Sequence, residues 1–273
     1  MRTRLGQNFL VDKNIAKKII RVADISLSDT IIEIGPGKGI LTDELINKSG
    51  KIIAVEIDKK LVIKLSEKYK NQKNIEIIHS DFLKYNPPNS AIAGQKLKFI
   101  ANLPYYISSA VISKILQLSN WDTAVFMVQK EVAIRLKAQP NSADYSVLTI
   151  ACQVFCEVEK MFDVPNTCFC PVPEVTSTVV RLNRLKKPLV KKNEEKNFFR
   201  IVKLAFLHRR KTILNSLSLE LRIDPALPKD FLRKGGVDKK ILEEKILQAG
   251  ISPQCRAETI PIDGFVKLAK VLT

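Results

Sequence analysis

The sequence predicts an α/β fold, in which a parallel sheet carries helices on both faces and a smaller all-helical domain follows. Through residue 182, short apolar runs alternate with amphipathic segments of helical length, the pattern of parallel strands joined by crossover helices. From residue 198 on, apolar residues recur at helical spacing and do not alternate as in a strand. A chain of 273 residues is long enough to bury one large core and a smaller one.

The strands of the first domain are short apolar runs between the helical segments. The first enters a glycine-rich turn directly, and the next two end in acidic residues. In chain order the predicted strands cover residues 30–35, 51–58, 74–81, 97–102, 123–129 and 174–182, the last of which closes the sheet. Helical spacing predicts helices over residues 14–25, 40–48, 59–69 and 109–118.

A charged linker, "NRLKKPLVKKNEEKN", separates this domain from the rest of the chain. We place the boundary within it and assign residues 1–186 to the first domain and residues 187–273 to the second. The second domain is predicted to be helical over residues 198–206, 211–221, 239–248 and 262–272.

The net charge of +17 is concentrated in the last third of the chain. Residues 1–180 contain 23 Lys and Arg against 18 Asp and Glu, whereas residues 181–273 contain 22 against 10. The two parts therefore carry +5 and +12. Such clustering favours a nucleic-acid partner, because neutralising phosphates releases condensed counterions. A solvated lysine-rich surface is the alternative, and a membrane surface is less favoured.

Several function classes are not indicated by the composition. No apolar run approaches the roughly 18 residues of a membrane span, and the N-terminus lacks the apolar core of a signal peptide. Five cysteines, an odd number, favour reduced thiols in a cytoplasmic protein. Cys168 and Cys170 are too close together for a zinc pair and have no histidine near them in sequence, so no metal is expected.

Three glycines, Gly35, Gly37 and Gly39, follow the first strand and lead into a helix. Such a turn brings backbone N–H groups close to a ligand at a helix N-terminus. The dinucleotide-binding fingerprint would need its third glycine at Ile40, and a Walker P-loop would need Ser or Thr after Lys38. The observed spacing resembles motif I of methyltransferases that use S-adenosylmethionine, which implies a Rossmann-like sheet.

Acidic residues at the next two strand ends agree with an adenosyl cofactor. Glu56 lies 21 residues after Gly35, where a carboxylate can accept hydrogen bonds from ribose hydroxyls. Asp81 ends the third strand and could accept from the adenine amino group, with Phe82 beside the ring. These groups meet beyond the carboxyl ends of the strands, where open α/β sheets bind ligands.

The tetrapeptide Asn102-Leu103-Pro104-Tyr105 follows the fourth strand and lies on the same edge of the sheet. The exocyclic amine of adenine is a poor nucleophile, because its lone pair is delocalised into the ring. The Asn102 side-chain carbonyl and the Leu103 backbone carbonyl could each accept one N–H of that amine, on the turn that Pro104 favours. Tyr105 would stack on the base and hold it outside its nucleic-acid stack. No general base is required.

A set of motifs in fixed order resembles one known family. The motifs are "RLGQNFLVD", "EIGPGKGILT", "VEID", "SDFLKY", "NLPYYISS", "CFCPVPEVTSTVVRL", "AFLHRRKTILNSL" and "RAETIPIDGFVKL". Together they resemble the KsgA family of small-subunit ribosomal RNA adenine dimethyltransferases, from residue 4 nearly to the end. The resemblance implies transfer of two methyl groups to N6 of each of two adjacent adenosines in the 3′-terminal stem-loop of that RNA. It also implies that the enzyme acts on an assembling subunit; we expect a cytoplasmic monomer.

The resemblance assigns further residues to the site. Asn8 and Leu10 would line the cofactor site, and Phe169 would face Tyr105 across the target base. The first domain would bind cofactor and carry out catalysis, and the second would bind RNA. In the basic stretch "HRRKT", expected to start a helix, the predicted contacts with the RNA backbone are Arg209, Arg210 and Lys211.

The sequence departs from the family pattern in places. Glu174 stands where lysine is common and His208 where glutamine is common. Only three residues precede Arg4, so either the N-terminal RNA contacts of the family are not expected or the start is truncated. Large-subunit rRNA dimethylation is the close alternative, and DNA or protein-glutamine methylation a more distant one. A non-catalytic assembly or transcription factor on the same fold is a third alternative, against which the intact cofactor and clamp residues argue.

Overall fold

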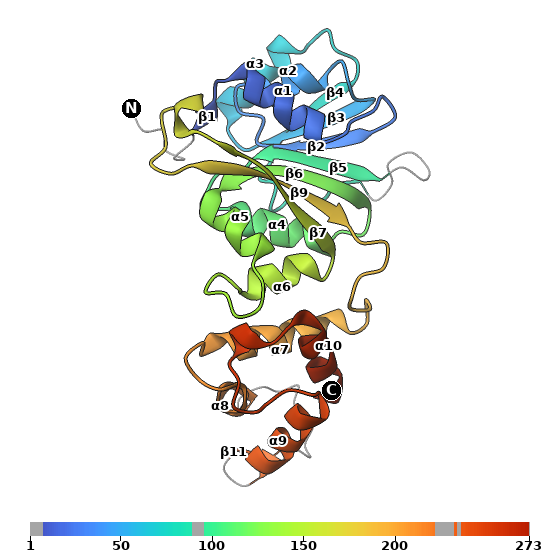
Figure 1. The fold of residues 1–273 in the computed structure, drawn as a ribbon. Coiled ribbons are helices and arrows are strands. Elements are labelled where there is room, and N and C mark those ends of the chain that lie inside the picture. The colour runs from blue at the N-terminus through green and yellow to red at the C-terminus, as the bar shows by residue number, and fades with distance from the viewer. Residues whose placement is uncertain (1–7, 89–95, 222–231, 234–235, 273) are drawn as a thin grey trace. The chain divides into compact units, whose positions relative to one another are not determined.

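The computed structural model describes residues 8–88, 96–221, 232–233 and 236–272 (Figure 1). The chain divides into two compact units. The first unit comprises Met1–Ile134 and Cys156–Leu185, and the second comprises Arg135–Phe155 and Lys186–Thr273. The predicted boundary lies beside the break after Leu185, but the sequence does not predict that residues 135–155 group with the second unit. Within the described residues, none of the helices has both the length and the apolar character needed to cross a membrane.

The predicted α/β class is confirmed by a seven-stranded sheet in the first unit, in the order β4-β3-β2-β5-β6-β9-β7. Its strands are β2 (Thr30–Ile34), β3 (Lys51–Glu56), β4 (Ile75–His79), β5 (Leu97–Asn102), β6 (Trp121–Gln129), β7 (Cys156–Val164) and β9 (Ser177–Arg184). The first five in chain order are parallel, whereas β9 is antiparallel to both β6 and β7. The sheet is therefore mixed, and its edge is formed by β7 rather than by the predicted late strand.

The strand order reverses next to β2. From β2 the chain proceeds through β3 to β4 on one side of the sheet, and β5 and β6 continue on the other side. Crossovers that leave in opposite directions open a crevice beyond the carboxyl ends of the two central strands. This switch point positions the site.

Helices cover both faces of the sheet, which is why its central strands are almost wholly apolar and buried. Figure 1 shows α1 (Lys13–Val22), α2 (Ile40–Leu45) and α3 (Lys59–Lys68) over one face and α4 (Ser108–Gln117) on the other. Helix α1 begins at the Asp12 side chain, which accepts hydrogen bonds from the N–H groups of Asn14 and Ile15. It ends earlier than predicted, because Asp24 adopts a left-handed backbone with φ of 46°.

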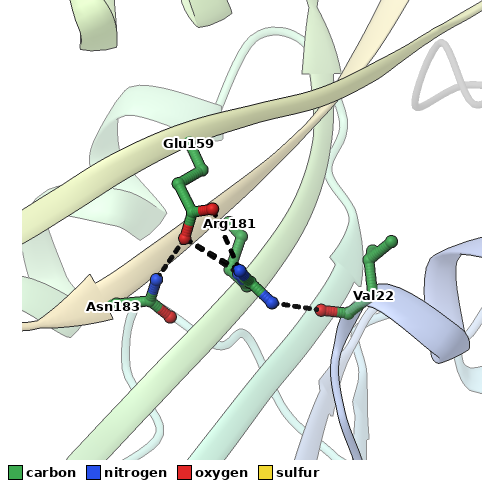
Figure 2. A network of polar contacts seen from close by, with 4 residues as sticks. All are labelled: Val22, Glu159, Arg181 and Asn183. Carbon is green, nitrogen blue, oxygen red and sulfur yellow. Dashed lines mark hydrogen bonds and ion pairs between the residues drawn. The ribbon is translucent and has the colours of Figure 1, made fainter.

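A polar network joins α1 to the outer strands of the sheet (Figure 2). The Arg181 guanidinium on β9 donates to both carboxylate oxygens of Glu159 on β7, at 2.9 and 3.0 Å from Nη2. Its Nη1 donates to the backbone carbonyl of Val22 at the end of α1, at 3.3 Å, where a cation is favoured by the helix dipole. Asn183 donates to the same carboxylate. The network fixes the β9–β7 pair against the N-terminal helix.

A short ladder joins the N-terminal segment of the first unit to the segment that precedes β9. Strand β1 (Phe9–Leu10) pairs antiparallel with β8 (Phe169–Cys170), so that Leu10 lies opposite Phe169. The N–H of Val11 extends the contact by donating to the carbonyl of Cys168 at 2.9 Å. The 3₁₀ turn Asn166–Cys168 precedes β8. Both strands are too short for an alternating pattern, and the sequence predicts neither.

The second unit is mainly helical, as predicted. Its helices are α6 (Val147–Gln153), α7 (Glu195–Leu207), α8 (Ile213–Glu220), α9 (Lys239–Gln248) and α10 (Ile262–Val271), with a 3₁₀ turn at Ala257–Thr259. Helix α5 (Lys130–Lys137) contains the point where the chain passes from one unit to the other. An unpredicted pair of short strands, β10 (Leu232–Arg233) and β11 (Gly236–Val237), precedes α9. Phe206 and Phe265 pack in the core with ring centroids 5.9 Å apart.

Candidate active site

A cavity of about 210 Å³ lies at the carboxyl ends of the central strands of the first unit. The predicted cofactor and clamp residues all line it: Asn8, Leu10, Gly35, Gly37, Glu56, Asp81, Phe82, Asn102, Leu103, Pro104, Tyr105 and Phe169. The structure thus brings together residues that are up to 161 positions apart (from Asn8 to Phe169) in the sequence. The lining also includes Phe9 and Tyr106, for which the sequence predicts no role.

The glycine turn is shaped by two aromatic residues. Gly37 has a positive φ of 60°, and a Cβ placed there would lie 3.1 Å from Cδ1 of Phe9. Gly39 has a φ of 84°, and a Cβ there would overlap the hydroxyl of Tyr69. That hydroxyl, at the end of α3, lies 3.0 Å from the carbonyl oxygen of Gly39 and 2.7 Å from Oδ1 of Asp43. Tyr69 therefore occupies the space that the side chain of any residue other than glycine at position 39 would need.

Replacing Gly39 with alanine should destabilise the first unit more than the same change at Gly35. Both glycines have left-handed backbones, which cost an alanine about 1–2 kcal/mol, but a Cβ on Gly35 meets nothing within 4 Å. The Gly39→Ala change must also displace Tyr69, and overpacking adds about 1–3 kcal/mol. Urea unfolding of the two variants measures the difference. An equal loss in the free energy of unfolding for both variants would show that Tyr69 can move aside at no cost in stability.

Glu56 holds the glycine turn by its carboxylate. The side chain is only 2% exposed; Oε2 accepts from the N–H of Gly37 at 3.0 Å, and Oε1 accepts from the N–H groups of Ile57 and Asp58 at 2.9 and 3.0 Å. A carboxylate has about four acceptor positions, so three are used by the protein. The one remaining acceptor position suits one strong hydrogen bond from a ligand hydroxyl. A second ligand hydroxyl would have to share a Glu56 oxygen with a backbone N–H group.

The turn that follows β4 forms the next part of the cavity wall. Asp81 Oδ1 accepts from the N–H of Leu83 at 2.9 Å, and Phe82 is buried with its ring edge-on to Phe99. Lys114, on α4, donates to the carbonyls of Leu83 and Tyr85 at 2.8 and 2.6 Å. Burial lowers the pKa of Lys114, while the nearby Asp81 carboxylate opposes that shift. Lys114 thus supports this turn, and no sequence pattern signals it.

The Asn102 side chain is oriented by the N-terminal segment. Its Nδ2 donates to the backbone carbonyl of Asn8 at 3.3 Å, so the amide oxygen is the group that remains to accept a hydrogen bond. The next residue, Leu103, is fixed by donation from its N–H to the carbonyl of Met127 on β6, at 3.1 Å. Asn8 was predicted to line the cofactor site, and its contact with Asn102 is an additional finding.

The two aromatic residues predicted to enclose the target base have different surroundings. Phe169 is 2% exposed and belongs to the hydrophobic core as well as to the cavity lining. Tyr105 is half-buried, and its hydroxyl lies 3.0 Å from Oγ of Ser177. Tyr106, beside it, is 66% exposed. Both predicted residues reach the cavity, and stacking on a base stays a prediction.

A buried acid, Glu33, lies on the strand that leads into the glycine turn. Glu33, at the heart of β2, is 1% exposed, and its Oε2 accepts from the Thr42 hydroxyl at 2.7 Å. Burial raises the pKa of Glu33 to about 8, with smaller contributions from the charges of Asp43 and Glu56. Among the described residues, its Oε1 has no hydrogen-bond partner.

The N–H groups of Gly35 and Gly37, which were expected to face a ligand, donate within the protein, to the Val55 carbonyl and to Glu56 Oε2 at 2.9 and 3.0 Å. The cavity offers the carboxylates of Glu56 and Asp81 and apolar walls, a set that fits an adenosyl cofactor carrying cationic groups.

The basic stretch of the second unit lies in the turn between α7 and α8. Helix α8 starts at Ile213 and is capped by Thr212, so the stretch precedes the helix rather than forming its first turn. Arg209 Nη2 donates to the carbonyls of Ala143 and Tyr145 at 2.9 and 3.2 Å, which ties the turn to the loop before α6. All three basic residues, Arg209, Arg210 and Lys211, are exposed.

Comparisons with known proteins find similar sequences over most of the chain. The family model described as "Ribosomal RNA adenine dimethylase" matches residues 1–236. "Ribosomal RNA small subunit methyltransferase A" of Clostridium botulinum (strain Loch Maree / Type A3) is 39% identical over 266 residues, covering 97% of this chain and 91% of that protein. The protein of the same name from Bacillus cytotoxicus is 40% identical over 273 residues, covering 98% and 90%.

Two solved structures are similar over nearly the whole chain. A dimethyladenosine transferase from Plasmodium falciparum has a TM-score of 0.81 and 28% identity and covers 95% of each chain. The 23S rRNA methyltransferase ErmE has a TM-score of 0.70 and 28% identity and covers 97% of this chain and 99% of its own.

Proposed function

Because the chain belongs to the ribosomal RNA adenine dimethylase family, we propose that it dimethylates N6 of two adjacent adenosines in the 3′-terminal stem-loop of small-subunit rRNA. It is an rRNA adenine dimethyltransferase that uses S-adenosylmethionine. The observation that carries the choice of small-subunit RNA is the near full-length likeness, at 39–40% identity, to proteins named for that subunit. We infer that it acts in the cytoplasm as a monomer, on an assembling subunit.

The cofactor supplies a methyl group on a sulfonium centre, which is an electrophile. Gly35 and Gly37 would let the ligand approach the backbone closely, Glu56 would accept from its ribose, and Asp81 with Phe82 would receive its adenine ring. These residues lie at successive strand ends and line one cavity, which supports their assignment.

The clamp prepares the target nitrogen. The Asn102 amide oxygen and the Leu103 carbonyl each accept one N–H of the adenine amine, which favours a pyramidal nitrogen with its lone pair available. The proton of the amine leaves to solvent after transfer, so no side chain must act as a base. Catalysis then rests on positioning and on two aimed dipoles.

Aromatic stacking and the basic unit place the RNA. Tyr105 stacks on the extruded adenine opposite Phe169, and stacking contributes about 1–3 kcal/mol per base. The second unit binds the phosphate backbone through Arg210 and Lys211, and Arg209 adds to the positive charge. Such contacts position the RNA without reading its sequence.

Methylation of purified precursor subunits tests the proposal. With S-adenosylmethionine, the protein should convert two adjacent adenosines at the 3′ end of small-subunit RNA to dimethyladenosine, as mass spectrometry of that fragment would detect. Large precursor subunits serve as the parallel substrate, because the ErmE structure is similar over 97% of the chain. Methylation of the large subunit alone would refute the small-subunit substrate and favour large-subunit rRNA instead.

A further inference from the structure

Ser177 is a buried hydroxyl in contact with the predicted stacking residue. Its side chain is fully buried at the start of β9, between Gln129 of β6 and Val164 of β7. Strands on both sides fix its backbone, so its Oγ occupies a defined position in the sheet. That atom lies 3.0 Å from the hydroxyl oxygen of Tyr105.

Tyr105 is thus held at both ends. Its backbone carbonyl accepts from Oγ of Ser108 at 3.0 Å, at the start of α4, and its phenol oxygen meets Ser177. The phenol oxygen lies on the axis about which the ring turns. The bond to Ser177 therefore fixes the direction of that axis, and with it the ring's place in the cavity wall, without preventing the ring from adjusting to a base.

We propose that Ser177 is a positioning residue for methyl transfer, which acts by holding the Tyr105 ring where an extruded adenine must stack. The inference rests on the proposed function. A base that stacks on a ring in a fixed position places its amine at a fixed distance from the acceptor oxygens of Asn102 and Leu103. Both hydrogen bonds to the amine depend on that distance. Misplacement by about 1 Å can cost a large factor in rate even when binding is unaffected.

Loss of the hydrogen bond between Ser177 and Tyr105 should lower kcat rather than raise KM for the RNA. Affinity for the subunit comes mainly from phosphate contacts, to which neither hydroxyl contributes. Ser177→Ala keeps the shape of the residue, and Tyr105→Phe keeps the stacking ring and removes only the oxygen. Because each change breaks the same bond, the second should cost nothing once the first has been made.

The test is a double-mutant cycle on kcat, with precursor small subunits and S-adenosylmethionine as substrates. Each single variant should lower kcat by about three- to tenfold, the range expected for one hydrogen bond, and the double variant should lower it no further. KM for the subunit should stay within about twofold, and rates are normalised to sites that bind S-adenosylmethionine, so that misfolded protein does not contribute.

Thr178→Val provides the matched control. Thr178 is the next residue on β9, also fully buried, and its hydroxyl donates to Oδ1 of Asp163 at 2.7 Å, outside the cavity lining. Loss of this hydroxyl should change stability but leave kcat as in the wild type. Multiplied losses in the double variant, or an equal loss of kcat in Thr178→Val, would overturn the role of Ser177. A wild-type protein that methylates no subunit RNA would instead overturn the proposed function, and the inference with it.

Discussion

Replacing Asn102 with alanine should lower kcat for methylation of the small subunit by at least about a hundredfold, because the proposed clamp would lose one of its two acceptors for the amine. Removing a single preorganised hydrogen-bonding group from an active site typically costs a factor of about 10²–10³ in kcat. The remaining acceptor, the Leu103 carbonyl, is a backbone group held by the bond from its own N–H to Met127, so it cannot move to compensate.

Binding should be affected far less than the rate. The amide nitrogen of Asn102 contacts only the Asn8 carbonyl among the described residues, at 3.3 Å, and RNA affinity comes mostly from phosphate contacts. We therefore expect subunit affinity within about tenfold of the wild type, since one hydrogen bond contributes about 0.5–1.5 kcal/mol. Single-turnover rates with radiolabelled methyl donor, together with filter binding of the subunit, separate the two quantities.

Asn74→Ala is the matched control. Its side-chain amide also donates to backbone carbonyls, those of Ile46 and Ser49 at 2.8 and 3.1 Å, but it lies outside the cavity lining. The Asn74→Ala variant loses an amide that bridges two backbone carbonyls, so it should be less stable. Its kcat should equal that of the wild type. A methylation rate in Asn102→Ala equal to that of Asn74→Ala would refute the clamp.

The site could be anticipated from sequence because its parts share one geometric rule. Each predicted residue from Gly35 to Tyr105 follows an apolar run whose own sequence predicts a strand. Parallel strands end at a common edge of the sheet. Local patterns therefore sufficed to place Glu56, Asp81 and Asn102 in one cavity, although they are far apart along the chain.

Other features of the site depend on contacts between distant segments. The β1–β8 ladder has only two residues on each side, too few for any periodicity, and the contacts of Tyr69 with Gly39 and of Asn8 with Asn102 have no local signal. Strand β7 does alternate at first, but its register shifts between Lys160 and Phe162, so the alternation is lost halfway along the strand.

The basic turn of the second unit shows the limit of reading charge from sequence. Arg209, Arg210 and Lys211 are equivalent by composition, whereas the structure uses Arg209 to bind the carbonyls of Ala143 and Tyr145. Substituting Arg209 would therefore mix a structural effect with an effect on RNA binding. A clean test of the predicted phosphate contacts uses the two exposed neighbours.

Reversing the charge of Arg210 and Lys211 to glutamate should weaken binding of the precursor subunit by at least about tenfold and flatten its salt dependence. Each phosphate contact contributes roughly 0.7–0.9 to the slope of log K against log salt, so losing two should reduce the slope by roughly 1.4–1.8. The measurement is a titration of subunit affinity at several salt concentrations. KM for the subunit should rise while kcat at saturation stays near the wild-type value, because neither residue lines the cavity.

Lys60→Glu with Lys64→Glu makes the same change in net charge on α3 of the first unit. Both lysines are exposed, so the pair reproduces the general electrostatic effect without touching the basic turn. If the turn contacts phosphates, the slope should change much more in the Arg210 and Lys211 variant than in the control, because direct phosphate contacts release condensed counterions. Equal slopes in both variants would mean that the basic stretch acts only through net charge, and the second unit would lose its assigned contact with the RNA backbone.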